Sequence, residues 1–332
     1  MDSNCNSQKK IPNFKEKESA RKFRYQKRRF YKFFDLPQLK SIFISPSHEC
    51  NANCVHCYEK FNNKAVVSLT TEKIKSIIIE FKKLGGDFVH YCSGEFLMRP
   101  DAIDLVRYAA MQKMGVSVTT NGLLADEAKI EELKQAGLTK LVISIDSAGE
   151  IKHDELRRVN GCFKKAIDAL KIAKEKGLVT KIWTYVSRTN FHELKDIAEL
   201  AKELQTNVAF VYFPLLSGHM FNSFDENLTF EEREMLREKY NGYSPLELEF
   251  PTEDSLCRGG GNEHINVLPT GDVTFCPPVP YSYGNVHDQK LKDILKLVVK
   301  DFKKFCTKRC TGQCIVNFQE YRENCNAKFI YK

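Results

Sequence analysis

The sequence of 332 residues has no long hydrophobic run and no apolar segment near its N-terminus. Its longest apolar stretch covers only residues 208–216 and includes Pro214. A helix needs about 20 apolar residues to cross a bilayer, so we expect no membrane span. The polar and basic start lacks the apolar core of a secretory signal, so we expect a cytoplasmic protein.

Most of the chain also lacks a net charge. Residues 1–34 hold 11 Lys and Arg against 3 Asp and Glu, a surplus of 8, and the whole chain has the same net charge of +8. The remaining residues are therefore balanced, 40 against 40. We expect residues 1–38 to form a basic arm that either binds an acidic peptide or serves solubility alone, and we do not expect nucleic acid or a membrane as its partner.

Cysteine, in contrast, is abundant, with 12 residues. A secreted disulfide protein can contain this many, but the expected absence of an export signal argues against that class. In a reducing cytosol, grouped cysteines more often bind metal or take part in catalysis. Most of them fall into two groups, which are Cys50, Cys54 and Cys57, and then Cys257, Cys276, Cys306, Cys310, Cys314 and Cys325.

Between these groups, strand-like segments alternate with helical patterns. Ile74, Ile77, Ile78 and Phe81, for example, recur at the spacing of one helix face. Such alternation predicts parallel strands joined by right-handed crossovers, either in a doubly wound sheet or in a partial barrel. The expected strands cover residues 41–47, 88–94, 116–120, 140–146, 180–187 and 208–213.

Ligand sites of parallel sheets lie at the carboxyl ends of the strands. Residue types suited to binding and catalysis follow the first four expected strands. We therefore expect them to meet in one site. They are Cys50, Cys54 and Cys57 after the first strand, Ser93, Gly94 and Glu95 after the second, Asn121 after the third, and Ser144 and Asp146 at the end of the fourth.

The three cysteines of this site offer soft thiolate ligands, which suit zinc, copper(I) or an iron–sulfur cluster. A structural zinc ion needs four closed ligands, and only His56, in a cramped position between two of the cysteines, could complete the set. Three thiolates on one loop can instead hold three corners of a cubane cluster. The fourth iron would then be open to a small molecule.

The spacing Cys-x3-Cys-x2-Cys at residues 50–57 resembles the signature of the radical SAM enzymes. "SGEFLMRPD" (93–101) resembles their Gly-Gly-Glu-Pro motif, although Phe96 replaces the proline. "TTNG" (119–122) matches their Thr-Asn-Gly, and residues 144–170 resemble the Ser-x-Asp…His-Asp-x-x-Arg run of the SPASM and Twitch subgroups. His56 stands where that family often has an aromatic residue that shields the cluster.

The resemblance implies a fold and a chemistry. The fold would be a partial (β/α)6 TIM-type barrel over residues 39–235, with a SPASM/Twitch-like extension over residues 236–332. The catalytic residues Cys50, Cys54 and Cys57 would bind a 4Fe–4S cluster, and S-adenosylmethionine would bind its open iron. An electron, supplied by a donor such as flavodoxin or ferredoxin, would cleave S-adenosylmethionine, and the 5′-deoxyadenosyl radical would abstract a hydrogen atom.

The same resemblance implies which residues bind S-adenosylmethionine. Glu95 and the carbonyl of Ser93, next to Gly94, would accept from its ammonium group. Arg157 or Arg158 would pair with its carboxylate. Ser144 and Asp146 would bind the ribose, and Asn121 a polar edge.

The last quarter resembles the opening of a SPASM or Twitch extension at residues 257–276, which predicts a small hairpin around Val273. Its six cysteines could bind one auxiliary 4Fe–4S cluster or two. A zinc knuckle formed by the last four is the alternative. Cys92 and Cys162 stand apart, and we expect them to be structural thiols.

For the function, we expect an enzyme that modifies a peptide or protein. The segment before the first strand is too short for a winged-helix leader-binding domain, so the basic arm or a separate protein would recognise the leader. The first alternative is a small-molecule enzyme, in sugar-alcohol dehydrogenation or in haem or cofactor biosynthesis. The second is a zinc-binding interaction protein whose basic arm contacts RNA.

Overall fold

The computed structural model describes residues 39–57, 67–211, 224–226, 228–240, 243, 246–249, 264–274, 281–305 and 328–329. In this part of the chain, nine strands form one sheet in the order β7-β6-β5-β4-β3-β2-β1-β8-β9. Strands β1 to β7 are parallel, and each lies beside the strand that precedes it. The strands are β1 (Ser41–Ile44), β2 (Phe88–Tyr91), β3 (Gly115–Thr120), β4 (Lys140–Ser144), β5 (Val179–Tyr185), β6 (Asn207–Val211), β7 (Leu246–Glu249), β8 (His264–Val267) and β9 (Val273–Thr274), and a separate pair is formed by β10 (Tyr281–Ser282) and β11 (Lys328–Phe329).

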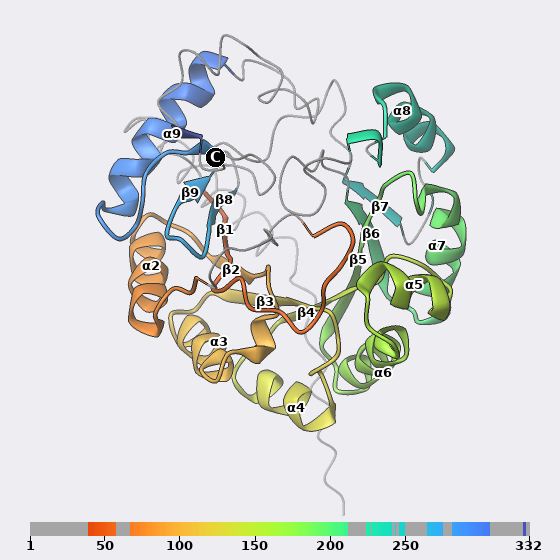
Figure 1. Cartoon of the computed structure of the whole chain (residues 1–332). Coiled ribbons are helices and arrows are strands. Elements are labelled where there is room, and N and C mark those ends of the chain that lie inside the picture. Colours follow the sequence, from red (N-terminus) through yellow and green to blue (C-terminus); the bar gives the residue numbers. More distant parts are fainter. Residues whose placement is uncertain are drawn as a thin grey trace, which may run out of the picture.

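The strand order decides between the two folds that the alternating pattern allowed. A doubly wound sheet reverses its winding near the centre, so that helices cover both of its faces. Here the winding continues in one direction from β1 to β7, and the helices surround the outside of the curved sheet (Figure 1). The sheet is therefore a partial TIM-type barrel, as expected. The helices are α2 (Thr71–Lys83), α3 (Ala102–Met111), α4 (Glu127–Gln135), α5 (Glu150–Arg157), α6 (Cys162–Glu175), α7 (Leu194–Glu203), α8 (Phe230–Lys239) and α9 (Leu291–Phe305), with short 3-10 turns at Phe96–Met98, Phe191–Glu193 and Phe224–Glu226.

All six predicted strands are confirmed, with ends that differ by a few residues. Several of the described elements were not predicted, among them β7 and α8. Helix α5 occupies residues that the sequence pattern marked only as a motif. Strand β8 pairs in parallel with β1, in the register Ser41 to His264, and the predicted hairpin follows it as the antiparallel pair β8–β9. The sheet therefore includes three strands, β7, β8 and β9, from the expected C-terminal extension over residues 236–332.

The two faces of the sheet differ in character because successive side chains of a strand point to opposite sides. Most side chains on the helix-covered face are apolar and fully buried, as the alternating burial of β1 illustrates. The concave face carries polar and aromatic side chains. The first set includes Ile42, Ile44, Val89, Val116, Val118, Leu141, Ile143 and Ile182, and the second includes Phe43, His90, Ser117, Thr119, Ser144 and Trp183.

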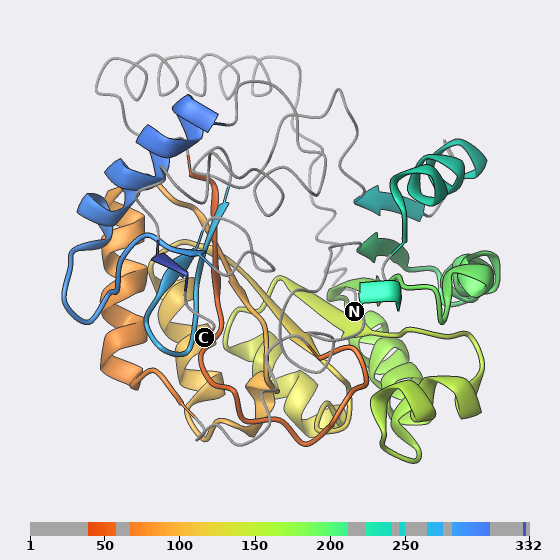
Figure 2. The ribbon, with the colours of Figure 1, turned by 45° about the horizontal axis from the view of Figure 1, so that its top comes forward.

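Helix α9, near the C-terminus, lies against α2, which follows the first strand (Figure 2). The backbone N–H of Leu291 donates to Glu80 at 2.8 Å, and Lys73 donates to the carbonyl of Val286 at 2.8 Å. Ile294 and Val298 of α9 are buried. The two ends of the described chain therefore belong to one core. None of the described helices is long and apolar enough to cross a membrane.

Candidate functional site

The loop that follows β1 carries Cys50, Cys54 and Cys57. It is held against the end of α5, because the N–H of Val55 donates to the carbonyl of Leu156 at 2.9 Å. Within the loop, the N–H of Cys57 donates to the carbonyl of Cys54 at 3.2 Å. None of the three cysteines forms a disulfide; Cys54 is buried, and the other two are half-buried. The expected site therefore presents three thiols on one tight turn.

These thiols are not arranged for a single ion. Among the described residues, no three His, Cys, Asp or Glu side chains converge on a point where one metal ion could bind. In a cubane cluster each thiolate binds a different iron atom, so its ligands stand apart. Three thiols on one loop can bind three iron atoms of such a cluster.

The loop after β2 packs directly on the cysteine loop. The N–H of Glu95 donates to the carbonyl of Glu49 at 2.7 Å. Gly94 has a φ of 57°, and a Cβ atom there would lie 2.4 Å from the carbonyl oxygen of Ser47 and 2.5 Å from that of Glu49. Only glycine fits this position. Ser93 before it also has a positive φ, 67°, which is uncommon for a residue with a side chain.

Glu95 is 2 % exposed, and both of its carboxylate oxygens are occupied. Oε1 accepts from the N–H of Leu97 at 3.1 Å, and Oε2 accepts from the N–H of Asn121 at 2.8 Å. Burial raises the pKa of Glu95, and the two backbone donors oppose this rise. The carboxylate thus fixes the loop after β2 to the loop after β3.

Asn121 continues this connection toward the cysteines. Its Nδ2 atom donates to Oδ1 of Asn51 at 2.7 Å and lies 4.0 Å from the Sγ atom of Cys50. Behind it, the thiol of Cys162 donates to the carbonyl of Asn121 at 3.7 Å. Burial raises the pKa of Cys162 to about 12, so the thiol is protonated at neutral pH. This is the environment of a structural thiol.

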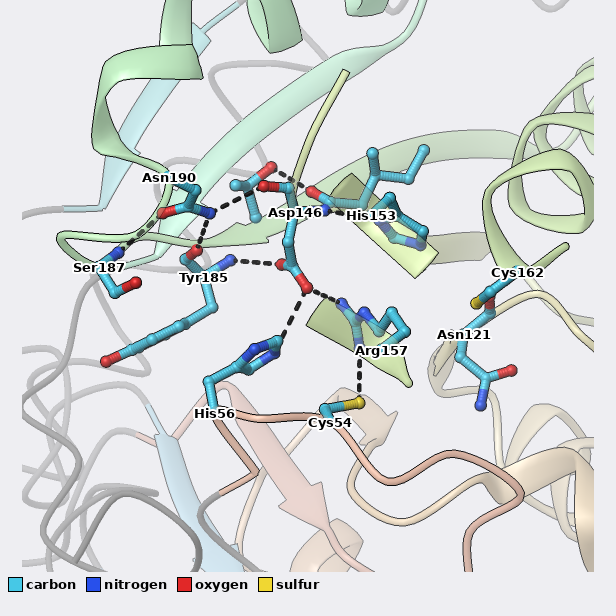
Figure 3. Close-up of polar contacts among 12 residues, drawn as sticks. Cys54, His56, Asn121, Asp146, His153, Arg157, Cys162, Tyr185, Ser187 and Asn190 are labelled. Atoms are coloured by element: carbon cyan, nitrogen blue, oxygen red, sulfur yellow. Dashed lines mark hydrogen bonds and ion pairs between the residues drawn. The ribbon is translucent and has the colours of Figure 1, made fainter. Parts of the chain in front are cut away.

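Asp146, after β4, is 1 % exposed and lies between several donors (Figure 3). Its Oδ2 atom lies 2.6 Å from Nη2 of Arg157 and 3.3 Å from Nε2 of His56. Its Oδ1 atom accepts from the N–H of Tyr185 at 3.1 Å. Burial alone would raise the pKa of Asp146, but the guanidinium of Arg157 and the imidazole of His56 hold that pKa below its usual value. Asp146 is therefore a carboxylate at neutral pH.

Of the two arginines at the end of α5, only Arg157 faces the site. It is 8 % exposed, and its Nη1 atom donates to the Sγ atom of Cys54 at 3.6 Å (Figure 3). Burial would lower the pKa of Arg157, but Asp146 keeps it above the usual value. The Nε atom is buried and has no hydrogen-bond partner in the described part of the chain. Arg158 is exposed and ends the helix in a left-handed conformation, with a φ of 53°.

Several residues of the site were missed by the sequence patterns. Nδ1 of His153 accepts from the N–H of Asp146 at 3.2 Å, and burial lowers the pKa of His153 to about 4. Asn190 donates to the carbonyls of Asp146 and Tyr185, both at 2.8 Å. The ring of His56 stacks on Tyr185, with centroids 5.2 Å apart.

Ser144, expected near a ribose, is half-buried beside Trp183 on the next strand.

Aromatic rings gather on the concave face of the sheet. His90 lies 4.8 Å from Phe43 and 4.9 Å from Trp183 between ring centroids. Its Nδ1 atom pairs with the hydroxyl of Ser117, and its Nε2 atom pairs with that of Thr119 at 2.8 Å. Burial, with some help from nearby lysines, lowers the pKa of His90 to about 3. This histidine is therefore neutral at physiological pH.

The remaining predicted site residues lie outside the described residues. These are the six cysteines expected to bind auxiliary clusters, together with the basic arm, for which the structure describes nothing before residue 39. The six are Cys257, Cys276, Cys306, Cys310, Cys314 and Cys325.

Two protein families match this sequence. The Radical SAM superfamily matches residues 44–201, which contain the cysteine loop and strands β2 to β5. The SPASM family, described as an iron–sulfur cluster-binding domain, matches residues 257–326, which contain the six C-terminal cysteines.

Curated relatives include an AdoMet-dependent heme synthase of Methanosarcina barkeri, 27 % identical over 84 % of this chain and 88 % of that protein. A PqqA peptide cyclase of Gluconobacter oxydans is 25 % identical over 76 % of this chain and 75 % of that protein. Among solved structures, SuiB of Streptococcus suis, bound to the precursor peptide SuiA, has a TM-score of 0.72. Its identity is 17 %, and the match covers all of this chain and 83 % of SuiB, which supports the same fold.

Proposed function

The chain is a radical SAM enzyme with a SPASM iron–sulfur cluster-binding domain, and we propose that it modifies a peptide or protein substrate. Enzymes of this kind bind S-adenosylmethionine and a 4Fe–4S cluster, and the SPASM domain adds auxiliary clusters. When bound, these groups supply a 5′-deoxyadenosyl radical, which abstracts a hydrogen atom from the substrate.

The residues at the carboxyl end of the barrel fit these groups. Cys50, Cys54 and Cys57 offer three thiols on one turn, none of them in a disulfide, as a cluster with one open iron requires. Arg157 has a buried N–H without a described partner, which suits an anionic group such as the carboxylate of S-adenosylmethionine. We assign the cluster to the three cysteines, and the methionine end of S-adenosylmethionine to Arg157 and to the loop of Ser93, Gly94 and Glu95, which the Glu95 carboxylate fixes in place.

This assignment gives a role to each residue around the cysteines. Glu95 holds the loop after β2 to Asn121 through two backbone N–H groups, so that the Ser93 carbonyl can face the ammonium group. The guanidinium of Arg157 lies 3.6 Å from the Sγ atom of Cys54, where it can donate to that ligand. Ser144 and Asn121 remain our candidates for the ribose and for a polar edge of the cofactor.

The peptide substrate is supported by the comparisons and by the charge of the chain. A PqqA peptide cyclase is among the relatives, and the fold matches that of SuiB with its precursor peptide. The surplus of 8 positive charges in residues 1–34 suits an acidic leader peptide. We further propose an external donor such as flavodoxin or ferredoxin, and a reducing cytoplasm, where clusters and 12 cysteines are stable.

A haem-related substrate is the second candidate. It is favoured by one specific observation: an AdoMet-dependent heme synthase is 27 % identical and matches over 88 % of its own length. A porphyrin substrate would be small, rigid and anionic, and it would need no leader-binding segment. The two candidates can therefore be distinguished by testing whether the enzyme converts a peptide or a porphyrin.

The protein purified without oxygen tests the proposal. We expect brown protein that contains iron and sulfide and that forms 5′-deoxyadenosine from S-adenosylmethionine and dithionite. Changing Cys50, Cys54 and Cys57 together to alanine should abolish this product while iron remains on the C-terminal cysteines. Product formation by the triple variant, or stoichiometric zinc in place of iron, contradicts the assignment.

The substrate is tested by mass spectrometry. The enzyme is expressed together with any short peptide encoded beside its gene, and in parallel it is incubated with an iron porphyrin that carries propionate groups. We expect a mass change in the peptide and none in the porphyrin. The opposite result replaces our proposal with the second candidate.

A further inference from the structure

The carboxylate of Asp146 is buried and already contacts several groups of the protein. Its carboxylate is 1 % exposed and is surrounded by donors from three separate segments. These are Nη2 of Arg157 in α5, Nε2 of His56 in the cysteine loop and the N–H of Tyr185 in β5. Figure 3 shows all three converging on its two oxygens.

The backbone of Asp146 is fixed as well. Its N–H donates to Nδ1 of His153 at 3.2 Å, and its carbonyl accepts from Asn190 at 2.8 Å. Asn190 in turn binds the carbonyl of Tyr185, so the loop after β5 and helix α5 hold Asp146 from two sides. With its backbone fixed, the carboxylate could turn toward a new partner only by giving up the hydrogen bond from Tyr185 and the pairing with Arg157.

Two sugar hydroxyls would therefore have to displace existing partners of Asp146. A carboxylate has about four acceptor positions. Here Oδ1 accepts a hydrogen bond from Tyr185, and Oδ2 is paired with the guanidinium of Arg157 at 2.6 Å and lies 3.3 Å from Nε2 of His56. One of these donors is the buried guanidinium of Arg157, which would lose its carboxylate partner. Leaving a buried charge unpaired is costly.

We propose that Asp146 is a positioning residue: it holds Arg157 and His56 in place beside the cysteine loop and does not bind the ribose. This inference rests on the proposed function, because it concerns how the protein binds S-adenosylmethionine. It replaces the ribose contact that the sequence led us to expect. Asp146 thus contacts both the guanidinium of Arg157, which donates to Cys54, and the imidazole of His56, which lies between Cys54 and Cys57 in the sequence.

A double-mutant cycle on binding tests this role. The affinity for S-adenosylmethionine is measured by equilibrium binding on anaerobic, reconstituted wild type, Asp146→Asn, Arg157→Ala and the double variant. We expect Asp146→Asn to weaken binding by about 10-fold, since a charge-assisted contact is misplaced. The double variant should be no weaker than Arg157→Ala alone, because Asp146 acts through Arg157. Penalties that simply add overturn the proposal.

A second cycle uses the cofactor itself. The same variants are titrated with the analogue of S-adenosylmethionine that lacks the ribose 2′-hydroxyl. A positioning residue predicts the same loss in Asp146→Asn for both compounds. A loss that shrinks for the analogue shows a direct ribose contact and overturns the proposal. If Asp146→Asn does not retain its iron, Asp146→Glu takes its place, and the same two patterns decide.

Asp154→Asn is the matched control. Asp154 lies on the same helix as Arg157 and accepts from the N–H groups of Gly161 and Phe163, at 2.5 and 2.8 Å, to hold the turn between α5 and α6. We expect a lower melting temperature and an unchanged affinity for S-adenosylmethionine. If this variant loses affinity as Asp146→Asn does, the effect is one of local folding, and the proposal fails. A wild type that does not bind S-adenosylmethionine at all contradicts the proposed function as well.

Discussion

The Nη1 atom of Arg157 lies 3.6 Å from the Sγ atom of Cys54, although 103 residues separate them in the sequence. Backbone bonds support the same approach, since the N–H of Asn53 donates to the carbonyl of Arg157 at 3.4 Å. The end of α5 and the cysteine loop therefore form one unit. The candidate site therefore depends on the packing of α5, which follows β4, against the loop that follows β1.

Glu95 should be necessary for the binding of S-adenosylmethionine. In Glu95→Gln, an amide replaces a carboxylate that accepts from the N–H groups of Leu97 and Asn121. A hydrogen bond to a charged group contributes roughly 1.5–3 kcal/mol. We expect a loss of affinity of about 10- to 150-fold, measured by equilibrium binding. Glu49→Gln is the control, because only the backbone carbonyl of Glu49 joins the two loops; equal effects in both variants would argue against a specific role for Glu95.

Gly94 should tolerate no side chain. Gly94→Ala adds a Cβ atom 2.4 Å from the carbonyl oxygen of Ser47, in addition to the cost of a left-handed backbone. Gly161→Ala is a matched control, since Gly161 has a φ of 76° but a Cβ atom there would meet nothing within 4 Å. We expect the control to lose about 1–2 kcal/mol of stability. Gly94→Ala should lose more, together with iron content, and equal melting temperatures for the two variants would be inconsistent with the close contact.

His90 should make the stability of the protein depend on pH. The pKa of His90 is about 3 in the folded protein, against 6.5 for an ordinary histidine. Below pH 6.5 the unfolded chain therefore binds a proton that the folded chain does not, and stability falls as pH falls. The loss approaches about 1.4 kcal/mol per pH unit. Above pH 6.5 this contribution is constant.

The variant His90→Gln can still pair with Ser117 and Thr119, but it lacks the group that takes up this proton in the unfolded chain. Urea unfolding of wild type and variant at several values between pH 7 and pH 5 measures the difference in their stability. We expect the advantage of the wild type to shrink as the pH is lowered. A difference that is constant over this range would show that His90 is not the titrating group.

Deleting residues 1–34 should weaken the binding of an acidic peptide substrate. The attraction is electrostatic and is screened over about 8 Å at physiological salt. We expect a higher apparent KM and a flatter dependence of KM on salt, while cleavage of S-adenosylmethionine without peptide continues. If KM is unchanged at every salt concentration, the arm serves solubility only, and the peptide proposal loses that support.

Much of the barrel was predictable from the sequence because its signals are local. The apolar strand segments and the helical spacing of residues such as Ile74 and Ile78 do not depend on distant contacts. The three thiols were predictable for the same reason, since their spacing lies within one loop. Strand β8 was not, because its pairing with β1 is decided more than 200 residues away along the chain.

The network around Asp146 was not predictable either. Successive residues of a helix point in directions about 100° apart, so the choice between Arg157 and Arg158 depends on where α5 ends. Asn190 lies in a loop whose sequence resembles an ordinary turn. Only the curvature of the sheet brings it to the carbonyl of Asp146.

The pairing of β8 with β1 also sets an order for synthesis. Strand β1 can pair with β2 as soon as residues 88–91 are available, but its other edge is covered only when residues 264–267 have left the ribosome. Until then, Ser41–Ile44 presents unpaired backbone groups, the kind of strand edge that other chains can join. A nascent or truncated chain that stops before residue 264 is thus an aggregation-prone intermediate, although it already contains every residue of the cysteine loop.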